Sequence, residues 1–535
     1  MGAHDYPLLI KSLLLVPLRQ TARTEILNRD LSRYDYATFG QRVARLGSAL
    51  LRLGVQPGDT VAIMEWDTPR YLECFFAVPM IGAVLQTVNV RLSAQQIRYT
   101  LDHSGASALL CNVDFMPLLA PIRAELPGLK RLVYLTDSES APSGPGWDAG
   151  YEQLLAGGDP GHDFPDFDEG TRATTFYTTG TTGLPKGVYF SHRQIVLHTL
   201  AVLYAMQLRP TDVYMPITPM FHVHAWGVPY AATAAGLKQV YPGRYLPDVL
   251  VNLVTTEKVT FSHCVPTILR MILDCPAAKD RDFKGWRVVI GGSAFPRALC
   301  LQALERGIDV FGGYGMSETC PVLSVARILP ELAGDGAAEV GYRVKAGLPI
   351  PLVDLRIRDT DGRDLLHDGV ASGEVVVRAP WLTQGYHRDE RATEALWAGG
   401  WLHTQDIGTI DPHEYLLVTD RLKDVIKTGG EWVSSLQLED IISGHAGVAE
   451  VAVIGVFDAK WGERPMALVV PRPGTPGDAS DIVAHVQRSV VRGEISKFAV
   501  PETILFVAQL EKTSVGKHDK KAMRKKYGTA DPARA

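Results

Sequence analysis

The chain has 535 residues, of which 46% are apolar and 21% are charged. This composition is typical of globular proteins, and it excludes a largely disordered chain or a small disulfide scaffold. The net charge of −5 is too small to attract nucleic acid or an anionic membrane through the overall field. No run reaches about 18 apolar residues, so we expect no membrane span. The six cysteines form no CxxC pair, which favours a reducing cytoplasm.

Strand and helix patterns alternate along the first part of the chain, and this alternation predicts an α/β fold with parallel sheets under helices. Thr38 and Gln41 form a capping box before apolar residues at helical spacing, and Gly54 supplies a stop signal. The strand-like run Val61–Met64 follows, and Asp67 is the candidate cap of the next helix.

The pattern of charged and apolar residues changes beyond about residue 419. A charged segment opens a compact stretch with its own apolar strands at Val451–Val456 and Ala467–Val470. We therefore predict a domain boundary there. The basic residues of 517–527 predict a helix with a solvated face rather than a membrane or nucleic-acid surface.

The segment Tyr177–Gly187 combines three glycines, four threonines and Lys186 within eleven residues. Glycines let backbone N–H groups turn around an anion, hydroxyls add donors, and the lysine adds a positive charge. The segment therefore predicts a phosphate-binding loop. A Walker loop would continue into a helix, whereas Val188–Phe190 is strand-like, which favours a strand-loop-strand arrangement. A flexible linker would not explain the placing of the lysine.

With this loop the chain resembles the adenylate-forming (ANL) superfamily of acyl-CoA synthetases, nonribosomal peptide adenylation domains and luciferases. The resemblance covers nearly the whole chain. Within the superfamily, the sequence is most similar to fatty-acid and medium-chain acyl-CoA ligases. The other matching segments are Pro219–His222, Gly291–Ser293, Gly313–Thr319, Gly373–Val377, Trp401–Asp406, Asp420–Lys427 and Lys512–Lys517.

The resemblance implies a large N-terminal adenylation domain of stacked sheets, residues 1–419, and a small mobile α+β C-terminal domain, residues 420–535. It implies that ATP and Mg²⁺ convert a carboxylic acid to its adenylate with release of pyrophosphate, after which coenzyme A takes the acyl group. The two steps need different surroundings, so the C-terminal domain is expected to rotate about a hinge at 420–424. We expect a cytoplasmic enzyme and leave a homodimer open.

The resemblance also implies a nucleotide site. Thr178 and Glu318 would hold Mg²⁺, which prefers hard oxygen ligands. Tyr314 would face the adenine and Asp406 would accept the ribose hydroxyls. The implied nucleotide-binding residues are Thr178, Thr179, Gly180, Thr181, Thr182, Gly183, Lys186, Gly292, Ser293, Gly313, Tyr314, Gly315, Met316, Ser317, Asp406, Arg421, Lys427 and Trp432.

Three residues are implied to be catalytic. Lys517 would stabilise the charge between the α-phosphate and the carboxylate, Glu318 would act through the metal, and His222 would line the entrance for the acid.

Domain rotation would use a further set of residues. Lys423 matches the pivot, and Gly429 and Gly430 would approach the channel for the pantetheine arm. Gln405 departs from the family, which has glycine there. Either the backbone at this position does not need a positive φ, or nucleotide affinity is altered.

Five side chains are candidates for the acid pocket. Trp226 lies where related fatty-acid ligases have an aromatic gate, and His263 and Cys264 stand where relatives have small residues. Phe295 would act likewise, and His224 lies nearby in the sequence. Added volume shortens a tunnel, which favours a short, medium-chain or aryl acid. Trp226, Cys264 and Phe295 could equally be packed in the core.

Two other functions stay open at this point. The polar character of His224, His263 and Cys264 suggests adenylation of nitrite or another oxyanion with transfer to an amine. A non-catalytic nucleotide-binding protein is the second alternative, against which Lys517 and Glu318 argue. Metal binding by the neighbouring histidines is not expected, because no carboxylate or cysteine completes a ligand set.

Overall fold

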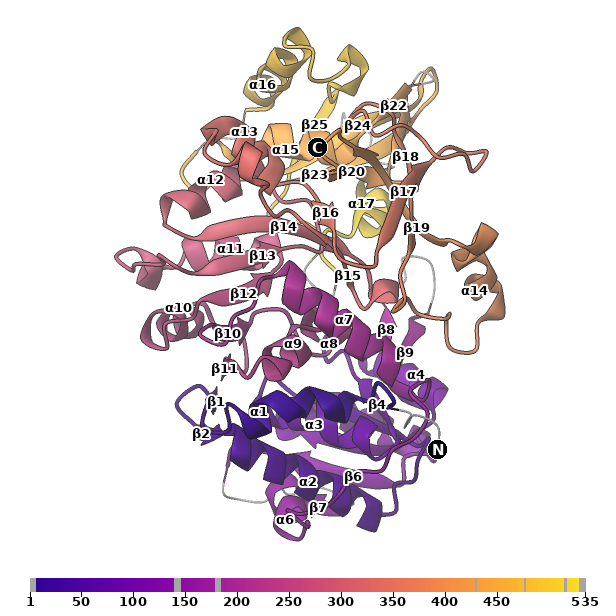
Figure 1. Cartoon of the computed structure of the whole chain (residues 1–535). Coiled ribbons are helices and arrows are strands. Elements are labelled where there is room, and N and C mark those ends of the chain that lie inside the picture. The colour runs from indigo at the N-terminus through magenta and orange to yellow at the C-terminus, as the bar shows by residue number, and fades with distance from the viewer. Residues whose placement is uncertain are drawn as a thin grey trace.

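The computed structural model describes residues 6–138, 146–178, 184–428, 431–475, 478–513 and 517–528. Within these ranges the strands form four sheets. Figure 1 shows the N-terminal sheet and its helices at one end of the molecule and the C-terminal strands at the other. The predicted α/β class with stacked sheets is confirmed.

The first sheet has the order β7-β6-β5-β3-β4-β8-β9. Its strands are parallel except β9, which pairs antiparallel with β8. The chain forms β3, then β4 on one side of it, and then β5 on the other side. The bounds are β3 (Thr60–Met64), β4 (Val84–Thr87), β5 (Ala106–Asn112), β6 (Arg131–Leu135), β7 (Ala149–Gly150), β8 (Arg172–Thr178) and β9 (Lys186–Ser191).

The second sheet has the order β16-β15-β14-β13-β12-β10-β11-β1-β2 and repeats this winding. The chain forms β10, then β11 on one side of it, and then β12 on the other, all parallel. The bounds are β1 (Glu25–Asn28), β2 (Ser32–Asp35), β10 (Val213–Pro216), β11 (Lys238–Tyr241), β12 (Phe261–Cys264), β13 (Arg287–Ile290), β14 (Asp309–Gly315), β15 (Val322–Val325) and β16 (Leu348–Pro349).

Two smaller sheets complete the structure. The four-stranded antiparallel sheet contains β17 (Asp354–Arg358), β18 (Gly373–Arg378), β19 (Leu402–Ile410) and β20 (Leu416–Arg421). The C-terminal sheet contains β21 (Ile426–Thr428), β22 (Glu431–Val433), β23 (Val448–Asp458), β24 (Gly462–Pro471) and β25 (Thr503–Phe506).

Helices cover both large sheets, and apolar side chains fill the layers between them. One buried cluster joins the first sheet to α2, α3 and α7, and a second lies under α10, α11 and α12. The α-helices are α1 (Leu15–Arg19), α2 (Tyr36–Arg52), α3 (Pro69–Met80), α4 (Ala94–Ser104), α5 (Met116–Leu119), α6 (Tyr151–Ala156), α7 (His192–Ala205), α8 (Val223–Trp226), α9 (Val228–Ala234), α10 (Pro247–Thr256), α11 (Pro266–Leu273), α12 (Arg297–Glu305), α13 (Gly336–Arg343), α14 (Glu390–Leu396), α15 (Ser435–Ser443), α16 (Ala479–Val491) and α17 (Lys520–Tyr527). In the described ranges, no helix is both long and apolar enough to traverse a bilayer.

The structure moves two of the predicted helix starts. Helix α2 is capped by Asp35, whose carboxylate accepts a hydrogen bond from Thr38 N at 2.8 Å, so the predicted capping box was wrong by one turn. Helix α3 begins after Thr68, and Asp67 does not cap it. The Asp67 carboxylate instead accepts a hydrogen bond from Met220 N at 2.9 Å.

The carboxyl ends of the strands in both large sheets face one another. Asp67 follows β3 and contacts the segment after β10, and Thr87 at the end of β4 donates to the carbonyl oxygen of Phe221 at 3.0 Å. Loops that follow parallel strands of the two sheets therefore meet between them, which positions the candidate site.

Candidate active site

The predicted phosphate loop joins two paired strands. Thr178 ends β8 and pairs with Lys186 at the start of β9, and the chain continues as strand after the lysine. This strand-loop-strand arrangement was predicted, and it excludes a Walker loop, which leads into a helix. The loop residues themselves lie outside the described ranges: Thr179, Gly180, Thr181, Thr182 and Gly183.

A buried carboxylate lies beside this hairpin. Glu318 follows β14, and its Oε1 accepts a hydrogen bond from Tyr386 OH at 2.7 Å. The Lys186 ammonium lies 4.5 Å from the centroid of the Tyr386 ring. Burial raises the pKa of Glu318, while this hydrogen bond and the charges of Arg421 and Lys186 oppose the rise. A carboxylate and the Thr178 hydroxyl are hard oxygen donors, so this donor set fits Mg²⁺.

Three predicted nucleotide residues meet at the middle of β19. Tyr314 OH donates to Asp406 Oδ2 at 2.7 Å, and Arg421 Nε lies 3.2 Å from Asp406 Oδ1. Asp406 and Arg421 are register neighbours on β19 and β20, which fixes their approach. The result is a buried carboxylate held between a phenol and a guanidinium.

The glycines around Tyr314 serve the packing of the sheet. A Cβ on Gly315 would lie 1.9 Å from the carbonyl oxygen of Pro321, because β14 and β15 approach closely there. Gly313, Met316 and Ser317 lie on the same segment of chain. The protein's own backbone therefore requires a glycine at position 315.

Lys517 reaches from the C-terminal part of the chain into the same region. Its side chain packs on Gly292, whose φ is +80° and whose neighbour is Ser293. Burial and the charge of Arg421 lower the pKa of Lys517 to about 8, while the charges of Asp406 and Glu318 oppose this. The ammonium is thus partly desolvated and faces the predicted nucleotide residues.

A cavity of about 40 Å³ lies between Lys517 and the carboxyl ends of β10 and β12. Burial and the charges of Lys517 and Arg91 lower the pKa of His222 to about 3, so its ring is neutral. Tyr245 OH donates to Asp67 behind the cavity wall. The lining residues are Arg91, Ile217, Thr218, Pro219, His222, Trp226, Tyr245, Val265, Thr267, Ile268, Gly292 and Lys517.

Of the five residues predicted for the acid pocket, the structure places one in the cavity wall and the others behind it or in the core. Trp226 lines the cavity, and its indole ring packs on the His263 imidazole with centroids 4.9 Å apart. His263 is a second layer, because it hydrogen bonds Tyr214 OH at 2.8 Å and Thr218 Oγ1 at 3.1 Å.

Besides His263, three of the expected pocket residues do not line this cavity. Cys264 and Phe295 belong to the apolar core under α11 and α12. His224 lies in a ring of aromatic side chains that includes Phe75 and Phe176, and neither ring nitrogen has a hydrogen-bond partner among the described residues. The cause is local, since all four residues of α8 have φ between 47° and 60°, and this left-handed turn directs His224 away from the cavity.

Two models of known protein families match the chain. The AMP-binding enzyme family matches residues 17–387, and the AMP-binding enzyme C-terminal domain matches residues 437–517. The chain belongs to the AMP-binding enzyme family. This membership confirms the predicted superfamily.

Relatives in this family agree along nearly their full length. The long-chain-fatty-acid–CoA ligase of Thermus thermophilus is 41% identical over 516 residues, 94% of this chain and 93% of the relative. The 3-methylmercaptopropionyl-CoA ligase of Ruegeria lacuscaerulensis is 36% identical over 541 residues, 98% of each chain. The crystal structure of ATP-bound MatB from Rhodopseudomonas palustris is similar in fold, with a TM-score of 0.85 at 24% identity over 98% of this chain and 99% of that one.

Membership of the AMP-binding enzyme family confirms the predicted enzyme class, an AMP-forming acid–CoA ligase that uses ATP and Mg²⁺ and transfers an acyl group to coenzyme A. The comparisons do not favour adenylation of nitrite with transfer to an amine.

In this AMP-binding enzyme, a hydrogen bond connects the last strand before the junction, β20, to the C-terminal part of the chain. Asp420 and Arg421 belong to β20, and the next strand begins at Ile426. Asp420 Oδ2 accepts a hydrogen bond from Ser435 N at 2.6 Å. Burial and the charge of Arg421 lower the pKa of Lys423.

Further predicted residues of the junction are described in part. Lys427 lies on β21, where its backbone N–H donates to Glu463, and Trp432 lies on β22. Gly429 and Gly430 lie outside the described residues.

Two residues of the candidate site were not predicted from the sequence. Tyr386 reaches Glu318 because it bridges to Val188 on β9, and Arg91 reaches the cavity from the loop after β4. Both are single side chains on loops, and no motif or spacing marks either of them.

Proposed function

We propose that this enzyme activates a short, medium-chain or aryl carboxylic acid and transfers it to coenzyme A. The cavity beside Lys517 carries the proposal. Its volume of only about 40 Å³ favours a compact acyl group over a long alkyl chain. Trp226 sets the limit, since its ring packs against Gly291, where a Cβ would lie 3.0 Å from the indole.

In the first step a carboxylate oxygen forms a bond to the α-phosphorus of ATP, and the bond from that phosphorus to the bridging oxygen of pyrophosphate breaks. Asp406 and Arg421 would hold the ribose, and Tyr314 the adenine. Lys517 would lie between the carboxylate and the α-phosphate and stabilise the developing charge. Mg²⁺, held by Thr178 and Glu318, would neutralise charge on the phosphates.

In the second step the sulfur of coenzyme A forms a bond to the acyl carbon, AMP leaves with the bonding electrons, and the thiol proton is lost to solvent. Lys517 occupies the reaction region in this structure, which suits the first step. We propose that the C-terminal domain then rotates about the hinge at 420–424, with Lys423 as pivot, and withdraws the lysine. This segment is a short connection between two sheets, since β20 ends at Arg421 and β21 begins at Ile426, and this supports a hinge there.

We also place the enzyme in the cytoplasm, which is supported by six buried cysteines that form no disulfide. A homodimer stays a prediction, and light scattering on the purified protein would test it.

The substrate proposal is tested with a series of carboxylic acids of two to sixteen carbons and several aryl acids. Pyrophosphate release is measured with and without coenzyme A. We expect the highest kcat/KM among the small acids. A kcat/KM that rises steadily to the longest chains would contradict the proposal, and Lys517→Ala supplies the background rate.

A further inference from the structure

A second group of cationic and imidazole side chains lies on the far side of the β8–β9 hairpin. Tyr386 bridges to Val188, and the next residue, His387, donates its N–H to the carbonyl oxygen of Gly187 at 2.8 Å. Successive residues of extended chain point to opposite faces. Tyr386 therefore faces Glu318, and His387 faces away from the nucleotide residues.

Arg172 is the centre of this group. Its guanidinium lies 3.8 Å from the centroid of the Tyr189 ring, and its Nη1 donates to His387 Nδ1 at 3.1 Å. It is half-buried, yet within the described part of the chain it forms no ion pair with a carboxylate. By contrast, Arg42 and Arg70 each pair with a buried glutamate. Buried guanidinium groups are normally paired, so Arg172 has spare capacity for an anion.

The neighbouring groups add hydrogen-bond donors and, at Arg388, one further positive charge. A guanidinium can only donate, so His387 Nδ1 must accept, and the ring is neutral with its proton on Nε2. Its ring centroid lies 5.3 Å from that of His103, whose Nδ1 contacts Tyr177 OH at 2.9 Å. Arg388 is exposed and has a φ of +54°, a conformation that is strained in a residue other than glycine. Its charge contributes to the lowered pKa values of Arg172, His103 and His387.

Two carboxylates also act on these groups, but neither neutralises Arg172. Asp102 and Asp389 influence His103. The Asp389 carboxylate accepts a hydrogen bond from Ala392 N at 3.0 Å, because it caps α14. Asp102 is exposed on α4. Arg388 directly follows His387, the hydrogen-bond partner of Arg172, and among the described residues neither carboxylate forms an ion pair with either guanidinium.

We propose that Arg172, Arg388, His103 and His387 form an anion site for a phosphate group, separate from the nucleotide site on the other face of the hairpin. The planar guanidinium of Arg172 suits two-point binding of phosphate oxygens, and the imidazoles supply further donors. In a reaction of ATP with coenzyme A, which is the function proposed above, two phosphate sources qualify. They are the released pyrophosphate and the 3′-phosphate of coenzyme A.

The test is calorimetric titration of the whole protein with its nucleotide site saturated by adenosine 5′-(β,γ-imido)triphosphate. One arm uses pyrophosphate, and the other uses adenosine 3′,5′-bisphosphate, which carries the 3′-phosphate. We expect one of these anions to bind, and Arg172→Gln to weaken that binding at least about tenfold. Arg209→Gln, which removes an exposed charge just before β10, should leave it unchanged.

The two arms separate the sources, and either positive result supports the site. Absence of binding in both arms, or equal binding by wild type and Arg172→Gln, overturns it. If Arg172→Gln does not fold by circular dichroism, Arg388→Gln gives the same comparison. No acid or coenzyme A enters the titration, so the result is independent of ligase activity, and an inactive enzyme could still show the site.

Discussion

The two large sheets have the same strand winding, but the carboxyl-end edge is filled in one sheet and lines a cavity in the other. In each sheet the chain forms one strand, then its neighbour on one side, and then its neighbour on the other, which creates a crevice at the carboxyl ends where ligands commonly bind. In the second sheet this crevice, between β10 and β12, holds the cavity with His222. In the first sheet the equivalent crevice lies between β3 and β5.

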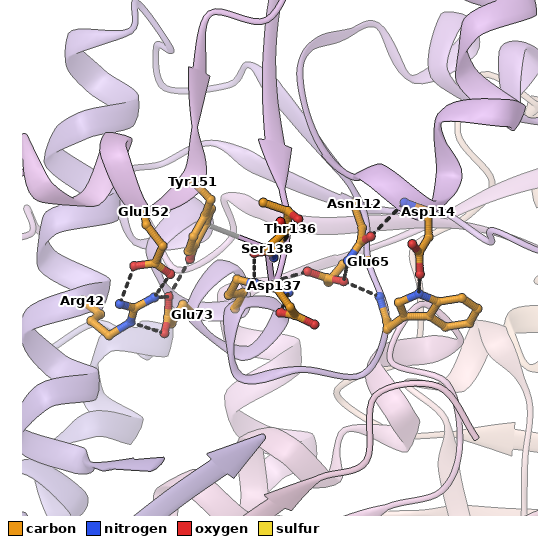
Figure 2. Close-up of polar contacts among 12 residues, drawn as sticks. Arg42, Glu65, Glu73, Asn112, Asp114, Thr136, Asp137, Ser138, Tyr151 and Glu152 are labelled. Carbon is orange, nitrogen blue, oxygen red and sulfur yellow. Dashed lines mark hydrogen bonds and ion pairs between the residues drawn. The ribbon is translucent and has the colours of Figure 1, made fainter. Parts of the chain in front are cut away.

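The crevice of the first sheet is filled by its own charges (Figure 2). Glu65 follows β3, and its Oε1 accepts from Asn112 at the end of β5 at 2.6 Å, while its Oε2 lies 3.1 Å from Arg70 Nε. Beside it, Glu73 accepts from Arg42 Nε at 2.6 Å and from Tyr151 OH at 2.6 Å. Both glutamates are buried and paired.

The difference between the two edges is whether buried charge is satisfied internally. At the first edge each of these two carboxylates meets an arginine and neutral donors, so both are satisfied without a ligand. At the second edge the ammonium of Lys517 and the neutral His222 line an open cavity. Equivalent positions in the same topology therefore hold paired buried charges in one sheet and line a cavity in the other.

The largest expected effect is on stability. The Arg42 guanidinium forms ion pairs with two carboxylates, those of buried Glu73 and exposed Glu152. Glu73→Gln removes the buried partner and leaves only Glu152. Breaking a buried pair in this way costs about 3–5 kcal/mol of unfolding free energy. Urea denaturation followed by circular dichroism measures the loss. Glu152→Gln is the matched control and should lose less than about 1 kcal/mol. A small effect of Glu73→Gln would show that the first edge is not held by its ion pairs.

At the second edge Lys517→Ala should act on catalysis instead. We expect a fall of about 10²–10³-fold in acid-dependent pyrophosphate release, because the charge of the transition state loses its main partner. Thioester formation from chemically prepared acyl-adenylate should change far less. Equal losses in both steps would contradict the assignment of Lys517 to the first step, and an unchanged unfolding midpoint controls for folding.

The pH profile gives the next effect. Burial lowers the pKa of Lys517 to about 8, so the ammonium proposed to assist adenylation is present below that pH and lost above it. The kcat/KM for adenylation, which reports the free enzyme, should fall about tenfold between pH 7 and 9. Lys517→Arg stays charged and should lose this descending limb, whatever its absolute rate. A descending limb that persists in Lys517→Arg would assign it to another group.

These residues also show how far the sequence could go. The loop, the Glu318 segment, Asp406 and Lys517 lie in ordered motifs, so their convergence could be expected from resemblance. The acid pocket could not, because it depends on side-chain direction. His263 and Cys264 are consecutive on β12, and successive side chains of a strand point to opposite faces, so both could not line one cavity. Arg91 and Tyr386 are brought in by contacts between distant segments that no local pattern encodes.

A smaller effect concerns Tyr386, which was found only in the structure. Tyr386→Phe removes the hydrogen bond to Glu318, and a bond to a buried carboxylate is worth about 1.5–3 kcal/mol. Its loss should raise the pKa of Glu318 further and reduce adenylation about tenfold at pH 7, with a larger deficit at lower pH because more Glu318 is protonated. Rates at varied Mg²⁺ and pH would check this. Tyr204→Phe, on an exposed tyrosine, is the control. An unchanged Mg²⁺ dependence would argue against Glu318 as a metal ligand.

The smallest effect is expected at Gln405, where the family has glycine. Gln405 has a φ of +59°, so the backbone does keep the left-handed conformation, and glutamine bears the strain. This conformation costs a residue other than glycine at least about 1 kcal/mol, part of which glycine loses again through the greater freedom of the unfolded chain. Gln405→Gly should therefore raise the unfolding free energy by less than about 1 kcal/mol. Gln405→Ala keeps the strain but removes the side chain, and should bring no such gain. If ATP affinity changes equally in both variants, the glutamine side chain rather than the strain acts on the neighbouring Asp406.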